Sequence, residues 1–154
     1  MTRPDPADPA TPRQLADFLC FAVYSANLAF GKAYKPRLDA LGLTYTQYIT
    51  LVAASEGEAQ TVGQLGERLY LESNTLTPIL KKLEALGYLA RQRAQHDERQ
   101  VLISLTPQGR QLRETLGKVS VADATGLSAE ESDATQQAVA RLRDRLVASV
   151  RNDD

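Results

Sequence analysis

The chain of 154 residues contains one cysteine, Cys20, whose thiol is the side chain best suited to redox chemistry. Tyr24 stands one helical turn later, and Tyr34 and Tyr45 follow within the same third of the chain. A phenol that donates a hydrogen bond to sulfur stabilises the thiolate, which attacks a peroxide to give sulfenic acid. By base rate, however, a lone cysteine is more often an inert core residue than a sensor. The residues alone leave both interpretations of Cys20 open.

A second group of side chains has the chemistry needed to bind DNA. Residues 73–86 are expected to form a helix with a buried stripe of leucine and isoleucine. Short polar groups at the start of such a helix can reach base edges in the major groove, and a lysine farther along can reach phosphate. A solvated helix face is the competing interpretation for this segment taken alone. The expected DNA-binding residues of this helix are Ser73, Asn74, Thr75, Thr77 and Lys81.

A hairpin is expected after this helix, with strands over residues 88–93 and 99–105 and a polar tip at 94–98. Arginines surround the tip although its folding needs no charge, and an arginine placed there can enter the narrow minor groove of DNA. Asp97 precedes Arg99 by two residues and is expected to pair with it in a structural role. The expected DNA-binding residues of the hairpin are Arg91, Arg93 and Arg99.

The distribution of charge favours a DNA-binding segment more than the net charge of −1 does. Residues 64–113 hold eight Lys and Arg against five Asp and Glu, whereas the rest of the chain holds ten against fourteen. A basic middle within an acidic protein is typical of a DNA-binding module on an acidic scaffold. One cysteine and one histidine exclude a cysteine-rich zinc site, and no metal or other cofactor is expected.

The first segments of the chain are expected to position the thiol. Residues 1–12 carry four prolines and are predicted to be a disordered tail without a secretory signal. A helix predicted from Arg13 is apolar on almost every side, which indicates that a partner subunit covers its second face. Its most apolar stretch, 15–30, is too short and too mixed to span a membrane. The expected compartment is the cytoplasm, because one cysteine cannot form an internal disulfide.

The remaining helix starts are predicted by a hydroxyl residue with a glutamine or glutamate three positions later. Such pairs occur at Thr44/Gln47, Thr61/Gln64 and Ser128/Glu131. Thr106-Pro107 predicts a further helix that runs to about residue 124, and Pro36 and Gly42 are expected to interrupt the chain after the first helix. The expected fold class is mainly α with a small β-hairpin wing, a winged helix-turn-helix between N- and C-terminal dimerisation helices.

This fold implies a division of the chain into four parts. Residues 1–12 are the tail, 13–43 the N-terminal helix with dimerisation and redox roles, 44–106 the winged helix-turn-helix, and 107–154 the C-terminal dimerisation helices.

The hairpin carries a resemblance to a known family. Asp97-Glu98-Arg99, followed by Val101, Leu105-Thr106 and Gly109, resembles the wing signature of the MarR family of bacterial regulators. Together with Leu65-Gly66 and the helix that ends at Gly87, the resemblance covers most of residues 44–110. It implies a homodimer whose first and last helices interlock. Such a dimer presents two recognition helices to a pseudo-palindromic double-stranded operator.

Four further segments strongly resemble the OhrR branch of that family, the organic hydroperoxide sensors. They are residues 19–25, 32–34, 43–48 and 67–71. The resemblance implies that Cys20 is oxidised and that Tyr34 and Tyr45 hydrogen-bond its sulfur, with Tyr24 nearby. It is to the type with one cysteine, whose sulfenic acid reacts with a low-molecular-weight thiol, cyclises or over-oxidises. The expected function is therefore a repressor that releases its operator when an organic hydroperoxide oxidises Cys20.

Two alternatives remain, and the second belongs to another class of function. The first is a MarR-type repressor released by a small aromatic or phenolic ligand at the dimer junction, with Cys20 not involved. The second is a thiol peroxidase, which would need a recycling partner and would leave the basic hairpin unexplained. A protein that is not an enzyme is accordingly expected.

Overall fold

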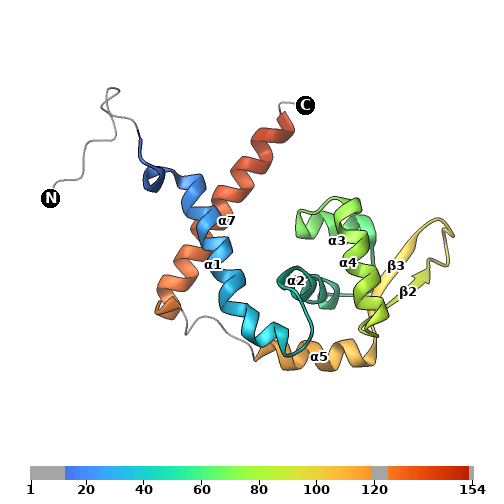
Figure 1. Cartoon of the computed structure of the whole chain (residues 1–154). Coiled ribbons are helices and arrows are strands. Elements are labelled where there is room, and N and C mark those ends of the chain that lie inside the picture. Colours follow the sequence, from blue (N-terminus) through green and yellow to red (C-terminus); the bar gives the residue numbers. More distant parts are fainter. Residues whose placement is uncertain (1–12, 119–124, 153–154) are drawn as a thin grey trace. The chain divides into compact units, whose positions relative to one another are not determined.

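The computed structural model describes residues 13–118 and 125–152, with the elements shown in Figure 1. In chain order they are η1 (Leu15–Asp17), α1 (Leu19–Asp39), α2 (Tyr45–Ser55), β1 (Gln60–Thr61), α3 (Val62–Leu69), α4 (Ser73–Ala85), β2 (Leu89–Arg93), β3 (Val101–Leu105), α5 (Pro107–Gly117) and α7 (Ala129–Asn152). Residues up to Leu116 form one compact unit, and those from Gly117 onward form another.

The first unit is built around a helix-turn-helix and a small sheet. Helices α2, α3 and α4 pack against one another, and the antiparallel sheet has the strand order β1-β3-β2. Branched side chains from every one of these helices and from β3 meet in the core, where water is excluded. Its fully enclosed members include Leu51, Leu65, Leu76, Leu80, Leu83 and Ile103. The predicted fold class, mainly helical with a winged helix-turn-helix, is confirmed.

Reciprocal caps begin the helices where the sequence predicts. Thr44 Oγ1 accepts from the Gln47 amide at 3.2 Å, while Gln47 Oε1 accepts from the Thr44 amide at 3.0 Å. Thr61 and Gln64 repeat this arrangement at 3.1 and 2.9 Å. Each pair satisfies two backbone donors that the helix leaves unpaired.

The last helix starts in the same manner. The Ser128 amide donates to Glu131 Oε2 at 2.8 Å, and Ser128 Oγ accepts from the Glu131 amide at 3.2 Å. The hydrogen bond from the Ser128 backbone, followed by that from its side chain, lowers the pKa of the Glu131 carboxyl. The start of α7 is thereby set by its own sequence.

The structure differs from the sequence prediction at α1. Residues 15–17 form a separate 3-10 turn, so the helix begins at Leu19 rather than Arg13. Pro36 lies inside the helix instead of ending it. The continued helix buries Leu38, whose carbonyl accepts the Leu43 amide at 3.0 Å, and this packing offsets the missing proline donor.

Strand β1 was not predicted at all. It contains two residues, with Gln60 opposite Ile103 and Thr61 opposite Leu102 of β3. A strand this short has no periodicity that a sequence pattern can reveal. The predicted tail over residues 1–12 and the predicted helical stretch 119–124 lie outside the described residues.

The described residues of the first unit leave most of the apolar surface of helix α1 exposed. Leu38 is its one buried residue, whereas Leu19 is 62% exposed. Other large apolar side chains exposed on this helix are Val23, Tyr24, Leu28 and Phe30. Within the second unit, α7 likewise exposes Val139, Leu146 and Val150. None of the described helices is both long and apolar enough to cross a membrane.

Candidate functional site

A tight turn joins α3 to α4 and sets the position of the candidate recognition helix. Tyr70 ends α3 in the left-handed conformation, with φ of 55°, and the Leu71 amide donates to the Gly66 carbonyl at 2.9 Å. A Cβ on Gly66 would lie 2.8 Å from the Leu71 carbonyl oxygen, so only glycine lets the turn fold back onto α3. Helix α4 then starts at Ser73.

The predicted DNA-binding residues of α4 lie on its outer side. Leu76, Leu80 and Leu83 point into the core, and the opposite face meets solvent. Thr77 is half-buried, and its hydroxyl donates to the Ser73 carbonyl at 2.7 Å, which ties it to the helix backbone. The exposed members are Ser73, Asn74, Thr75 and Lys81.

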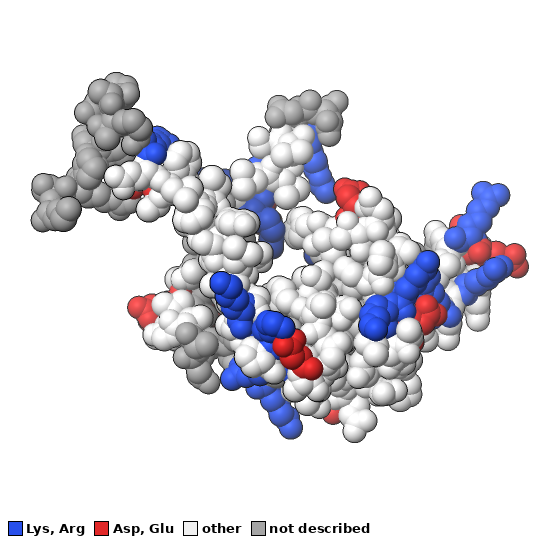
Figure 2. Space-filling view, viewed as in Figure 1, with Lys and Arg blue, Asp and Glu red and all other residues white. Residues whose placement is uncertain are grey.

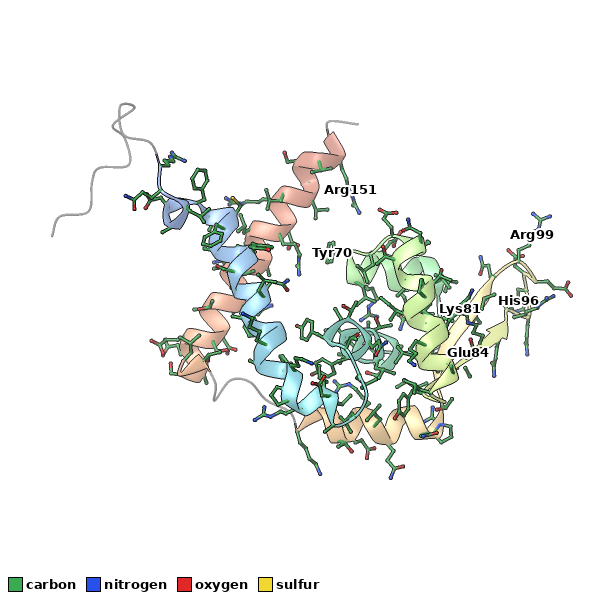
Figure 3. The ribbon with its side chains drawn as sticks, in the orientation of Figure 1. Tyr70, Lys81, Glu84, His96, Arg99 and Arg151 are labelled. Carbon is green, nitrogen blue, oxygen red and sulfur yellow. The ribbon has the colours of Figure 1, made fainter. Side chains whose placement is uncertain are left out.

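The hairpin places Arg93 and Arg99 near its outer end. The register pairs Leu89 with Leu105 at the root and Arg93 with Val101 before the tip. Both arginines are exposed, and Figure 3 shows Arg99 and His96 at the far end of the hairpin. The structure therefore brings two of the three predicted hairpin arginines to the tip.

Asp97 orders this tip through the backbone. Its carboxylate accepts from the backbone amide of Arg99 at 3.0 Å, and its carbonyl accepts from the Gln100 amide at 2.9 Å. Asp97 thus contacts Arg99 through the backbone amide. The guanidinium of Arg99 remains exposed and is not needed to close the turn.

Arg91 lies at a different place from the other two arginines. It stands opposite Ile103 within the sheet, and its Nε is 2.8 Å from Oε2 of Glu84 on α4. Figure 3 shows Glu84 on the side of α4 that faces β2. Figure 2 shows basic side chains gathered over this end of the first unit, with acidic ones between them. The surface is thus of mixed charge with a basic outer rim.

A polar network behind the helix-turn-helix was missed by the sequence analysis. Arg68 forms an ion pair with the Glu56 carboxylate, and its Nη1 donates to Gln60 Oε1 at 3.2 Å. The buried Gln60 amide in turn donates to the Ala53 carbonyl at 2.9 Å. These contacts join α2, β1 and α3. Residues so distant in sequence carry no common pattern that would have predicted them.

Cys20 is the second residue of α1 and is exposed in the single chain. Tyr24 lies one turn farther along and is 59% exposed. The ring of Tyr24 is 6.4 Å from that of Phe21, measured between centroids. The expected proximity of Cys20 and Tyr24 on one helix is compatible with this geometry, and the thiol is open to a partner chain.

Tyr34 of α1 and Tyr45 of α2 belong to a cluster of three rings. Their centroids are 5.2 Å apart, and Tyr48, which the sequence analysis did not single out, lies 5.4 Å from Tyr34 and 6.1 Å from Tyr45. Burial, followed by the neighbouring Tyr48, raises the pKa of Tyr34 and of Tyr45. Both phenols therefore stay protonated at neutral pH and can donate hydrogen bonds.

The structure does not bring Cys20 and the tyrosine cluster together within one chain. Cys20 and Tyr34 are fourteen residues apart on the same continuous helix, and Pro36 comes after both. At the rise of an α-helix this separation is about 21 Å. Tyr34 and the Tyr45 ring packed on it therefore cannot hydrogen-bond the Cys20 sulfur of their own chain.

Comparisons with known proteins identify related regulators. A family model described as transcriptional regulator SarA/Rot matches residues 32–116. The chain is 48% identical over 101 residues to the organic hydroperoxide resistance transcriptional regulator of Bacillus subtilis. The aligned region covers 66% of this chain and 69% of that protein. The chain is 45% identical over 139 residues to the HTH-type transcriptional regulator TtmR of Methylorubrum extorquens, with coverage of 89% and 71%.

A solved structure shows a related chain on DNA. Reduced AbfR bound to DNA matches with a TM-score of 0.74 and 38% identity, covering 88% of this chain and 94% of that one. AbfR is a protein of Staphylococcus epidermidis.

Proposed function

Because the chain belongs to the SarA/Rot family of MarR-like, DNA-binding transcriptional regulators, we propose that it is a repressor which senses organic hydroperoxides through Cys20. It binds a pseudo-palindromic operator as a homodimer and releases it on oxidation. The name of the Bacillus subtilis relative and the DNA-bound form of AbfR support this proposal. The protein acts in the cytoplasm, without a cofactor and without turning over a substrate.

The observation that carries the proposal is the arrangement along α1. Cys20 lies at the start of this helix, the tyrosine cluster lies near its end, and the apolar surface between them is uncovered. In a dimer with a two-fold axis across α1, the start of one helix meets the end of the other. Tyr34 and Tyr45 of one protomer then donate to the Cys20 sulfur of its partner. Tyr24 contributes from the same chain as the thiol.

The chemistry of the switch balances without a metal. The Cys20 thiolate attacks the outer peroxide oxygen, so an S–O bond forms as the O–O bond breaks. The leaving alkoxide takes up the proton that the thiol had released and becomes an alcohol. The peroxide is thereby reduced, and the sulfur is oxidised to sulfenic acid. A low-molecular-weight thiol then condenses with the sulfenic acid to give a mixed disulfide and water.

The adduct acts by weakening the dimer geometry that fits DNA. A hundredfold loss of operator affinity corresponds to about 2.7 kcal/mol between the reduced and oxidised states. Inserting a bulky group between two packed α1 helices is sufficient for a change of this size. The two recognition helices then no longer match successive major grooves.

The DNA-contacting residues of the proposal lie on α4 and the hairpin tip. The start of α4 reads base edges, Lys81 contacts phosphate, and the tip arginines enter the minor groove. The proposed residues are Ser73, Asn74, Thr75, Thr77, Lys81, Arg93 and Arg99. The boundaries proposed for these roles are 13–43 for dimerisation and sensing, 44–106 for DNA binding and 107–154 for dimerisation.

The experiment that tests the proposal is a DNA-binding titration with DNA from upstream of the protein's own gene. Wild type and Cys20→Ser are compared before and after one equivalent of cumene hydroperoxide, with a low-molecular-weight thiol present. We expect peroxide to release the wild type and to leave the variant bound. Retention of both on the DNA would refute the sensing role and favour release by a small aromatic or phenolic ligand instead.

A further inference from the structure

The contact between α4 and the root of the hairpin links the two elements that reach DNA. Arg91 is 28% exposed and Glu84 is 42% exposed, and they form an ion pair at 2.8 Å. Nε and Nη2 of Arg91 are buried and make no hydrogen bond of good geometry within the described part of the chain. The Glu84 carboxylate is therefore the group that compensates the burial of this guanidinium.

We propose that the Glu84–Arg91 ion pair is a positioning contact that fixes the wing against the recognition helix α4. The proposal goes beyond peroxide sensing and rests only on DNA binding by these two elements. In it, Arg91 acts through Glu84 and does not bind phosphate. Arg91 was expected from the sequence to be a DNA contact, and its place at the hairpin root assigns it this other role.

The ion pair lies at the root of the hairpin, so a small rotation there displaces the residues at the tip. Arg91 pairs with Ile103 at the root, and the tip around Asp97 lies beyond the last strand pair, Arg93 with Val101. Arg99 itself is four residues from Ile103, the partner of Arg91, which is about 13 Å at the rise of a β-strand. A rotation of about 10° at the root would therefore move Arg99 by about 2.3 Å, enough to break a hydrogen bond of ordinary length. An ion pair that limits this rotation lets Lys81 and Arg99 meet the same DNA molecule in one geometry.

The presence of Glu84 itself favours this interpretation. A carboxylate on the DNA-reading part of the protein repels phosphate, so on electrostatic grounds alone its removal strengthens binding. If Glu84 instead holds the wing in place, its removal weakens DNA binding. Neutralising Glu84 therefore distinguishes a purely repulsive carboxylate from a positioning one by whether the affinity for DNA rises or falls.

The first experiment is a DNA-binding titration at several salt concentrations with Glu84→Gln. Glu98→Gln, which removes an exposed carboxylate from the hairpin tip, is the matched control. We expect affinity to fall about five- to tenfold for Glu84→Gln, from the usual coupling of such pairs, and to rise slightly for Glu98→Gln. Tighter binding by Glu84→Gln would overturn the proposal.

Arg91→Gln and the charge swap Glu84→Arg/Arg91→Glu complete this series. We expect Arg91→Gln to weaken binding without changing the slope of log affinity against log salt, because a lost phosphate contact reduces that slope by about one. The swap should restore most of the lost affinity. A reduced slope for Arg91→Gln, or a swap weaker than either single variant, would contradict the positioning role.

The second experiment tests the geometry without DNA. Spin labels on Lys82→Cys and Gln95→Cys, in a Cys20→Ser chain diluted into unlabelled chains, report the distance between α4 and the tip within one protomer. We expect Glu84→Gln to broaden this distance distribution while the melting temperature stays within a few degrees of the parent. An unchanged distribution would refute the proposal. That result would leave DNA binding and peroxide sensing untouched, so failure of the positioning role can be told apart from failure of the proposed function.

Discussion

The separation of Cys20 from the tyrosine cluster predicts that each thiol is activated in trans. The test uses mixed dimers in which one subunit carries Cys20→Ser and the other carries Tyr34→Phe with Tyr45→Phe. The single remaining thiol then lies on the chain without the two phenols. Because Cys20 and Tyr34 are about 21 Å apart along α1, the Tyr34 and Tyr45 that reach this thiol in the proposed dimer are those of the partner subunit.

The size of the effect follows from the chemistry of the thiolate. A hydrogen bond to a charged acceptor contributes roughly 1.5 kcal/mol, so the two phenols together stabilise a charged sulfur about a hundredfold, a factor lost when both are removed. A more basic thiolate is also a stronger nucleophile, with a Brønsted coefficient near 0.5, which recovers about half of the loss on a logarithmic scale. The rate constant with cumene hydroperoxide should therefore fall about tenfold when both phenols are missing.

The assay measures loss of the free thiol against time under excess peroxide. We expect the mixed dimer to react at the wild-type rate per thiol and the Tyr34→Phe/Tyr45→Phe homodimer to react about tenfold more slowly. Differently tagged subunits allow the mixed dimer to be purified. If the mixed dimer reacts as slowly as that homodimer, the phenols act within one chain and the trans arrangement is wrong. Equal rates for all dimers would show that Tyr34 and Tyr45 do not affect the oxidation of Cys20.

Three further predictions concern stability and DNA binding. A Cβ on Gly109 would lie 2.1 Å from the Tyr88 carbonyl oxygen, so Gly109→Ala should lower the free energy of unfolding by about 3 kcal/mol, whereas Gly63→Ala, with no atom closer than 3.9 Å, should not. Chemical denaturation at matched protein concentration checks this. Arg99→Ala should weaken operator binding about tenfold and reduce its salt slope by about one, as measured by fluorescence anisotropy. The raised pKa of Tyr34 means that its contribution to stability is present below pH 10 and is lost as the pH rises through the folded-state pKa. Tyr34→Phe should therefore show a smaller fall in melting temperature between pH 8 and pH 11, and an equal fall would contradict the assignment.

Sequence reasoning succeeded where the determining contacts are local. The caps at Thr44, Thr61 and Ser128 each join residues three apart, so their spacing predicts the contact directly. The positions of α4 and of the hairpin follow from the leucine stripe and the alternation after Gly87. Contacts between residues only a few positions apart are those that a single sequence can predict.

Contacts between distant parts of the chain escaped prediction. The ion pair from Glu84 to Arg91 and the network around Arg68 depend on how helices meet strands. Pro36 predicted a break, but burial of Leu38 outweighed the local preference. Tyr34 and Tyr45 were recognised by their residue type, but their packing against Tyr48 across α1 and α2 depends on how the two helices meet.

The double role of Thr61 has a consequence for folding during synthesis. This residue caps α3 with its hydroxyl, and through its backbone it pairs with Leu102 of β3. The helix-turn-helix and the wing are therefore joined by a strand pair that spans about forty residues of chain. A nascent chain still attached to the ribosome lacks this pairing until Ile103 has emerged. The DNA-reading unit consequently becomes complete in one late step of translation, and shorter fragments contain its helices without its sheet.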